Sequence, residues 1–311
     1  MTVRTGRAIG VVAASLAVMA AAESRPVFSV GALRRDGIVI PFATYDKSHW
    51  ETNWPAPKLD LIVPVDLRAV PSGWWGPAPP PRTWEAWIGR ATPQAVDVTK
   101  LDWVDVHCVR QVGLKTTYQS DRPVPPPTIQ PYPKDGLVVS PPQPIEPIEV
   151  LAASDREVQA LADDVRVAFN KAEREVEDHY GHSIKRQARE GIAPEIEAVY
   201  AYGHEPRVYY VEATRSYRKL GQTAGECVEM AFATGWFSRE REVTRSIATV
   251  LDLLRCDRYG ASYMFPFGVL RLNGKLFWLA QFSGWDRERF VVVEIGRKTV
   301  EARINVYGGG C

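Results

Sequence analysis

The sequence contains few of the motifs that identify common catalytic or metal-binding sites. It has no glycine-rich P-loop, no dinucleotide fingerprint, no H-E-x-x-H pair, no EF-hand loop and no G-x-S-x-G nucleophile elbow. Its four cysteines do not form a C-x-x-C pair, which argues against zinc ribbons and thioredoxin-type redox sites. We therefore expect no metal, and no cofactor is indicated.

The chain also has almost no excess of positive over negative residues. The chain has 38 Lys and Arg residues against 37 Asp and Glu residues, so its formal net charge is +1. Positive and negative residues are interspersed, and such a balance attracts neither nucleic acid nor anionic lipid. We predict that the protein has no nucleic-acid partner.

Long apolar runs are absent except near the N-terminus. Arg4 and Arg7 precede an apolar stretch that ends in three alanines, the last of them Ala22. The stretch is roughly 15 residues long and a membrane-spanning helix needs roughly 20, so a transmembrane anchor is the less favoured interpretation. A basic start, a short apolar centre and small residues are typical of a secretory signal peptide. We predict a signal peptide over residues 1–22 and export of the mature chain to the periplasm, the cell surface or the medium.

An exported chain can form disulfides. The four cysteines, which permit two bonds in three possible pairings, are Cys108, Cys227, Cys256 and Cys311. Cys311 follows three glycines and would be poorly held without a bond. We hypothesise a bond between Cys256 and Cys311, whereas Cys108, on the apolar side of a predicted strand, is interpreted as a buried thiol.

Proline divides the chain into parts. Ten prolines lie within residues 121–147, and because proline fixes φ and lacks an N–H donor, this segment should be extended. We predict a Trp-rich irregular β lobe over 23–120, a semi-rigid connector over 121–149 and a second domain over 150–311. A proline-rich recognition motif for another protein is the alternative interpretation of the connector.

Tryptophan is concentrated in the first lobe. Seven of the ten tryptophans lie there, and four are in the segment PSGWWGPAPPPRTWEAW. We interpret most of these rings as fillers of an irregular core. Neighbouring residues of an extended chain point in opposite directions, so Trp74 and Trp75 should not enter one core together. We hypothesise that one of them belongs to a ligand-binding surface.

Short β-branched and apolar runs predict strands in this lobe, and an internal proline in two of them indicates edge strands or bulges. The predicted strands cover residues 37–46, 59–70, 84–91 and 101–112.

The second domain begins with a helical pattern. Ser154 and Glu157 have the spacing of a capping box. Apolar residues then recur at steps of three and four, and the pattern stops near Gly181. We predict one amphipathic helix over 155–179.

From Pro194 to Tyr307 the pattern changes to a period of two. Asn273-Gly274 suits a type I′ hairpin turn. Residues 241–255 match both a helical and a strand spacing, and their β-branched content favours a strand. The predicted fold class is α+β, mainly β: an antiparallel meander sheet with the long helix packed on one face and water on the other.

Two histidine-containing patterns are candidates for chemistry. His179 and His182, three residues apart, could share a metal, but no third ligand follows and a histidine also suits the C-terminal dipole of a helix. Asp105 and His107 alternate on a predicted strand and could form an acid–base pair. No nucleophile has a recognisable context beside them, so we predict a solvated polar face there.

The glutamates Glu195, Glu197 and Glu212 could supply the carboxylate pair of a glycosidase, although strand alternation explains them equally well. From these patterns we predict an exported, non-catalytic binding protein whose partner is a glycan, a peptide or a protein. The alternative is a secreted hydrolase that acts on polysaccharide or cell wall through a carboxylate pair.

Overall fold

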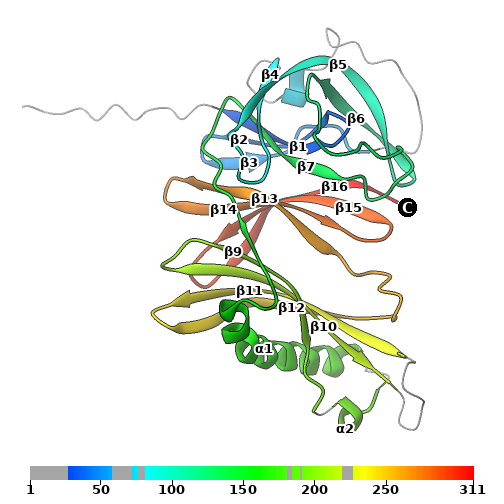
Figure 1. Cartoon of the computed structure of the whole chain (residues 1–311), viewed down its shortest axis with the longest axis vertical. Helices are drawn as coiled ribbons and strands as arrows, with labels where there is room; N and C mark the ends of the chain where they lie inside the picture. The colour runs from blue at the N-terminus through cyan, green and yellow to red at the C-terminus, as the bar shows by residue number, and fades with distance from the viewer. Residues whose placement is uncertain (1–26, 58–71, 76–80, 181–183, 190, 219–226) are drawn as a thin grey trace, which may run out of the picture.

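The computed structural model describes residues 27–57, 72–75, 81–180, 184–189, 191–218 and 227–311. The protein is mainly β, with antiparallel sheets and one long helix, as predicted. Four layers stack along its long axis: a barrel, a four-stranded sheet, a five-stranded sheet and the helix (Figure 1). The predicted signal peptide and the predicted strand at 59–70 lie outside the described residues.

The N-terminal lobe is a six-stranded barrel. Its strand order is β1-β7-β4-β5-β6-β2, and β2 pairs again with β1 to close it, while β3 adds to β2. The strands are β1 (Phe28–Arg34), β2 (Ile38–Asp46), β3 (His49–Glu51), β4 (Thr83–Trp87), β5 (Gln94–Val106), β6 (Val109–Thr116) and β7 (Lys134–Ser140). Closure pairs the sheet edges that would otherwise be free.

Proline shapes the barrel without excluding the chain from it. Pro41 lies in β2 beside a register shift against β1, which is the bulge that an internal proline predicts. The predicted connector contains β7, which pairs with β1 and β4 and is buried along its whole length. That part of residues 121–149 is therefore a barrel strand, because its apolar run between proline clusters completes the wall. The domain limits themselves stay a prediction.

Tryptophan fills the barrel. Trp54, Trp75 and Trp84 are buried in a cluster that draws residues from all six barrel strands. Trp54 Nε1 donates to the carbonyl of Val112 at 2.9 Å. The rings of Trp74 and Trp75, on the short 3₁₀ helix at Ser72–Trp75, stand against Trp54 with centroids 5.5 and 5.0 Å away. These rings contribute to the core, as we interpreted most of the tryptophans. The expectation that Trp74 and Trp75 would not enter one core together is wrong, because they lie on a 3₁₀ helix and not on an extended segment.

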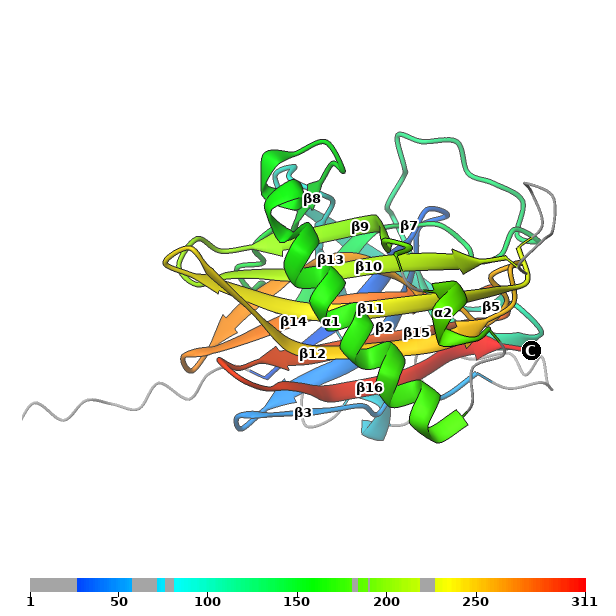
Figure 2. The same cartoon turned by 90° about the horizontal axis from the view of Figure 1, so that it is seen from below.

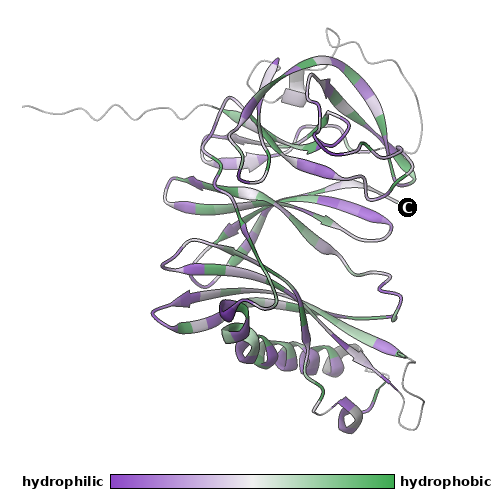
Figure 3. Cartoon of the chain, viewed as in Figure 1, coloured by the Kyte–Doolittle hydropathy of each residue, from purple (hydrophilic) through white to green (hydrophobic). Residues whose placement is uncertain are grey.

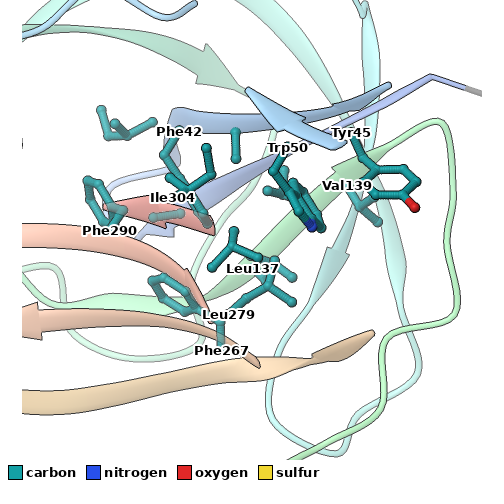
Figure 4. Packing of buried hydrophobic residues seen from close by; sticks show 14 of the residues in the cluster. Phe42, Tyr45, Trp50, Leu137, Val139, Phe267, Leu279, Phe290 and Ile304 are labelled. Atoms are coloured by element: carbon teal, nitrogen blue, oxygen red, sulfur yellow. The ribbon is translucent and has the colours of Figure 1, made fainter. Parts of the chain in front are cut away.

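The four-stranded sheet is buried on both faces. Its strands are β13 (Tyr263–Leu272), β14 (Lys275–Ser283), β15 (Arg287–Ile295) and β16 (Val300–Gly310). Phe277 and Leu279 of β14 pack on the barrel, and the alternating Trp278 and Ala280 pack on the five-stranded sheet. Figure 4 shows the first of these contacts, where Phe42 and Leu137 of the barrel meet the sheet.

The five-stranded sheet carries the helix. Its strands are β8 (Glu149–Leu151), β9 (Glu195–Tyr202), β10 (Arg207–Tyr217), β11 (Glu229–Glu240) and β12 (Val243–Leu254). Helix α1 (Arg156–Tyr180) crosses its outer face diagonally (Figure 2). The strand preferred over a helix for residues 241–255 is confirmed by β12.

The expectation of one sheet with a wet face is wrong. The stretch from Pro194 to Tyr307 folds into two antiparallel sheets, and each follows the meander order. The sequence carries a sign of this, because the consecutive apolar residues of β14 and β15 are typical of strands covered on both faces. Figure 3 shows the two sheets lying face to face. Its colouring by hydropathy also shows that α1 has a hydrophilic side.

Helix α1 matches its prediction within one residue at each end, but its cap differs. The carbonyl of Asp155 accepts the N–H of Gln159, so Asp155 is the capping residue. The carboxylate of Glu157 binds Arg207 and Tyr209 and not the helix terminus. Glu157 therefore forms an ion pair with Arg207 of β10 instead of the predicted capping box.

The turn between β13 and β14 is as predicted. Asn273 and Gly274 have positive φ values of 53° and 75°, which a type I′ turn requires.

The disulfide pairing is not the one hypothesised. Cys108 bonds to Cys311, and Cys227 bonds to Cys256. Cys108 is therefore no free thiol, and it holds the C-terminal end of β16 against the barrel. The stacking of the barrel on the four-stranded sheet brings these two cysteines together, and local sequence carries no information about that stacking.

Candidate functional site

A cavity rich in arginine lies between the C-terminal half of α1, the short helix α2 (Arg186–Arg189) and the end of β10. Its volume is about 240 Å³. Among the described residues that line it, the charged ones are Arg166, Arg174, Arg186, Arg189, Arg215, Glu173 and Glu177. Five guanidinium groups against two carboxylates make this cavity cationic.

Glu173 organises the floor of the cavity. Its side chain is buried, and its Oε2 accepts from Arg215 Nη1 at 2.9 Å. The hydroxyl of Tyr217 donates to the other oxygen. Arg189 Nη1 lies 3.8 Å from Glu173 Oε2. Burial and the bond to Glu173 raise the pKa of Tyr217, so its hydroxyl stays a neutral donor.

The guanidinium of Arg215 is held on three sides. Its Nη2 donates to Asn170 Oδ1 at 2.7 Å, and its plane lies over the ring of Phe169, 4.6 Å from the centroid. Contact with an aromatic ring, together with hydrogen bonds from two separate Nη atoms, fixes an arginine in a way that is not open to a lysine. The charge of Arg215 is therefore placed before any ligand arrives.

Two of the buried arginines have an N–H group with no hydrogen-bond acceptor among the described residues. The Nε atoms of Arg215 and Arg189 are buried, and neither has a hydrogen-bond acceptor among the described residues. Arg189 is only 4% exposed, and its Nη2 lies 2.7 Å from Glu177 Oε2. A buried donor without a partner costs about 1–3 kcal/mol. An anion in the cavity would remove that cost.

Helix spacing explains part of this arrangement. Arg166, Asn170, Glu173 and Glu177 recur at steps of four and three, so they share one side of α1. That side borders the apolar stripe, which packs on the sheet. The other arginines come from α2 and β10, and only the tertiary structure brings them to the same place.

A second cavity, of about 390 Å³, is already neutralised by its own residues. Arg207 donates to Glu149 at 2.9 Å and to Glu157 at 2.8 Å. Burial alone would raise the pKa of Glu157, but the bonds from Arg207 and Tyr209 outweigh it and lower that pKa. This cluster ties β8, α1 and β10 together, and its charges are paired within the protein.

The tryptophans singled out from the sequence lie outside the arginine cavity. Trp75 is 2% exposed, and Trp74 is partly buried beside it in the barrel cluster. Nothing in these positions tests a ligand-binding role for either ring, and that role stays a prediction.

The predicted polar face at the end of β5 is only half right. Asp105 is exposed and pairs with Arg110 at 3.0 Å. His107 lies in the turn to β6 with a positive φ of 52°, which breaks the strand alternation. Its side chain is 3% exposed, and its Nε2 is 3.8 Å from a carboxylate oxygen of Glu288. Burial lowers the pKa of His107.

The metal interpretation of the two histidines near Gly181 falls outside the described part of the chain. His182 and the side chain of His179 are not described. Among the residues that are, no group of three or more His, Cys, Asp or Glu side chains could hold a metal ion.

The glutamates considered as a catalytic pair have different surroundings. Glu212 is buried between the two sheets, where desolvation and the nearby Glu197 raise its pKa to about 7, against the bond from the Met264 N–H. Glu197 forms an ion pair of 2.6 Å with Arg258. Glu195 is exposed at the start of β9.

Comparison with protein-family models, with curated proteins and with solved structures finds no match to this chain. In the described part of the chain, no helix has the length and apolarity to cross a membrane. The two disulfides are compatible with export.

Proposed function

We propose that this protein is an exported, non-catalytic binding protein that holds an anionic ligand in the arginine-lined cavity. The observation that carries the proposal is the pair of buried Nε donors on Arg189 and Arg215, which have no acceptor among the described residues. Arginine forks recognise carboxylate and phosphate groups through paired hydrogen bonds. The ligand is therefore a molecule that presents a carboxylate or phosphate group.

The size of the cavity supports a small ligand or one group of a larger one. Small-molecule sites commonly measure about 300–1,000 Å³, and this cavity, with about 240 Å³, is smaller than that range. An acidic sugar or the carboxylate of a peptide fits the glycan or peptide partner predicted from the sequence.

Calorimetric titration in a buffer low in chloride tests the proposal with inorganic phosphate, citrate and galacturonate as probes. We expect at least one probe to bind, and Arg174→Gln to weaken that binding about tenfold, which corresponds to about 1.4 kcal/mol. Lys171→Gln is the matched control, since it removes the same charge from an exposed position on the same helix that does not line the cavity. Equal weakening by both variants would point to general electrostatics and contradict the proposal.

The hydrolase alternative has one observation in its favour. The pKa of Glu212 is raised to about 7, so this carboxyl could donate a proton, and a second carboxyl group, that of Glu197, lies nearby in contact with Arg258. Against it, Glu212 is 2% exposed. If cell-wall polysaccharide incubated with the protein gains reducing ends, and Glu212→Gln abolishes this gain, the non-catalytic proposal is wrong.

A further inference from the structure

Two aromatic rings from separate loops meet on the surface, and neither belongs to the tryptophan cluster of the barrel. Tyr259 lies between β12 and β13, and Trp285 lies in the turn between β14 and β15. Their ring centroids are 5.3 Å apart with 56° between the planes. Trp285 is 72% exposed and Tyr259 is 47% exposed. A tryptophan left in water gives up the stabilisation that its burial would bring, so this pair calls for an explanation.

Both loops are held in place. The hydroxyl of Tyr259 donates to Asp286 Oδ2 at 3.0 Å. The N–H of Cys311 donates to the carbonyl of Asp286 at 2.9 Å, and Cys311 is bonded to Cys108. On the other loop, Cys256 stands three residues before Tyr259 and is bonded to Cys227. The rings are therefore set in position before any ligand binds, which reduces the entropy lost on binding.

Charged groups surround the two rings. Asp286 accepts from Tyr259 and from Arg287 Nε at 3.2 Å, and Asp257 and Arg258 directly precede Tyr259 in the chain. The bond from Tyr259 lowers the pKa of Asp286, so this carboxylate stays ionised. An apolar protein or lipid surface would have to desolvate these charges. A polyhydroxylated ligand would give them hydrogen bonds.

The size of the patch excludes a large partner. One aromatic side chain can bury about 150–250 Å², whereas a stable protein interface takes about 800 Å² from each partner. Two rings suffice for one or two sugar units.

We infer that Tyr259 and Trp285 form a glycan-binding site, separate from the arginine cavity. The C–H face of a pyranose ring packs on the indole of Trp285. Sugar hydroxyls donate to the carboxylate of Asp286 and accept from Arg287.

Titration calorimetry of the full mature chain with cellohexaose and with N-acetylchitohexaose tests this site. We expect one of the two oligosaccharides to bind, Trp285→Ala to weaken its binding at least tenfold, and Trp285→Tyr to restore part of it. The matched control is Phe265→Ala, another exposed ring that is 41% accessible and lies in β13 outside the pair. We expect the control to bind as the unaltered protein does. Arg174→Gln should also leave this binding unchanged, so failure here is distinguishable from failure of the anion site.

Three results would overturn the inference. The first is no binding of either oligosaccharide at millimolar concentration, and the second is equal binding by the Trp285→Ala variant. The third comes from two parallel measurements, sedimentation of the protein alone and flotation with phosphatidylcholine–phosphatidylglycerol vesicles. If Trp285→Ala changes only self-association or only vesicle binding, the ring serves a second copy or a membrane surface.

Discussion

Single carboxylates in this protein behave according to what surrounds them. Glu173 is buried, and its two carboxylate oxygens accept hydrogen bonds from Arg215 and Tyr217. Glu212 is also buried, yet among the described residues it accepts only the N–H of Met264, and its burial together with the nearby Glu197 raises its pKa to about 7. The same residue type thus forms, on α1, a hydrogen-bonded contact with Arg215 and Tyr217, whereas between the two sheets it is a group with a raised pKa.

The stability of the protein should fall as the pH rises from about 5 to about 8. In the unfolded chain Glu212 ionises at its ordinary pKa of 4.5, whereas in the folded protein it holds its proton up to about 7. Between these values the unfolded state loses the proton first, so deprotonation favours unfolding. Glu212→Gln keeps an acceptor for Met264 and should be more stable than the unaltered protein at pH 8, by roughly 2–3 kcal/mol. Urea denaturation at both pH values measures this.

Glu195→Gln serves as the control because Glu195 is exposed on the neighbouring strand. Its pH dependence should match that of the unaltered protein. A Glu212→Gln variant with the same fall in stability between pH 5 and pH 8 would show that other groups are responsible.

At the scale of elements, helix α1 has one side that packs on a sheet and a neighbouring side that lines a cavity. Leu161, Val165 and Phe169 pack on the five-stranded sheet. The neighbouring polar side lines the arginine cavity. Because both sides belong to one rigid helix, the packing of the apolar stripe also positions the helix residues of the candidate site.

Leu161→Ala should therefore destabilise the protein by about 2–5 kcal/mol, since the side chain is fully buried and its loss leaves a cavity. Val167→Ala, on the exposed side of the same helix at 63% exposure, should change stability by less than about 0.5 kcal/mol. Urea denaturation followed by circular dichroism compares the two. Similar losses in both variants would mean that α1 does not pack as described.

At the scale of the whole molecule, a buried ion pair joins the barrel to the four-stranded sheet. Lys134 Nζ of β7 lies 2.6 Å from Glu288 Oε2 of β15, and both side chains are at most 3% exposed. Gln281 Nε2 also donates to Glu288, at 2.9 Å. Close by, the Cys108–Cys311 bond connects the same two layers. The layers are therefore held by apolar packing, by one covalent bond and by a desolvated ion pair.

Glu288→Gln should cost about 3–5 kcal/mol, because it leaves the ammonium of Lys134 buried without its counter-charge. The double variant Lys134→Met/Glu288→Leu removes both charges and should recover more than half of that loss. Guanidinium denaturation followed by tryptophan fluorescence measures both variants. A double variant as unstable as the single one would show that the ion pair itself stabilises the junction.

The sequence predicted the local elements well, because the interactions that form them are local. Helix α1 follows from apolar residues at steps of three and four, and the β13–β14 hairpin follows from Asn273-Gly274. β12 was ambiguous in spacing, and its β-branched residues decided it correctly. The apolar residues of β7 are evident in the sequence, but the prolines on both sides led to its prediction as part of a connector and not as a strand.

The layers and the disulfide partners were decided by tertiary structure alone. The same holds for both candidate sites, apart from the four residues that helix spacing places on one side of α1. An alternation with a period of two predicts which residues share a face of a strand. It does not predict which sheet a hairpin joins or which part of the molecule covers that face. Cys311 can bond to Cys108 because the barrel stacks on the four-stranded sheet. Arg215 and Arg189 both contact Glu173 because α2 lies beside α1. Trp285 looked like any other tryptophan in the sequence, and only its place on a loop left it in water. Contacts between residues so distant in the chain depend on the packing of whole layers, which no local pattern encodes.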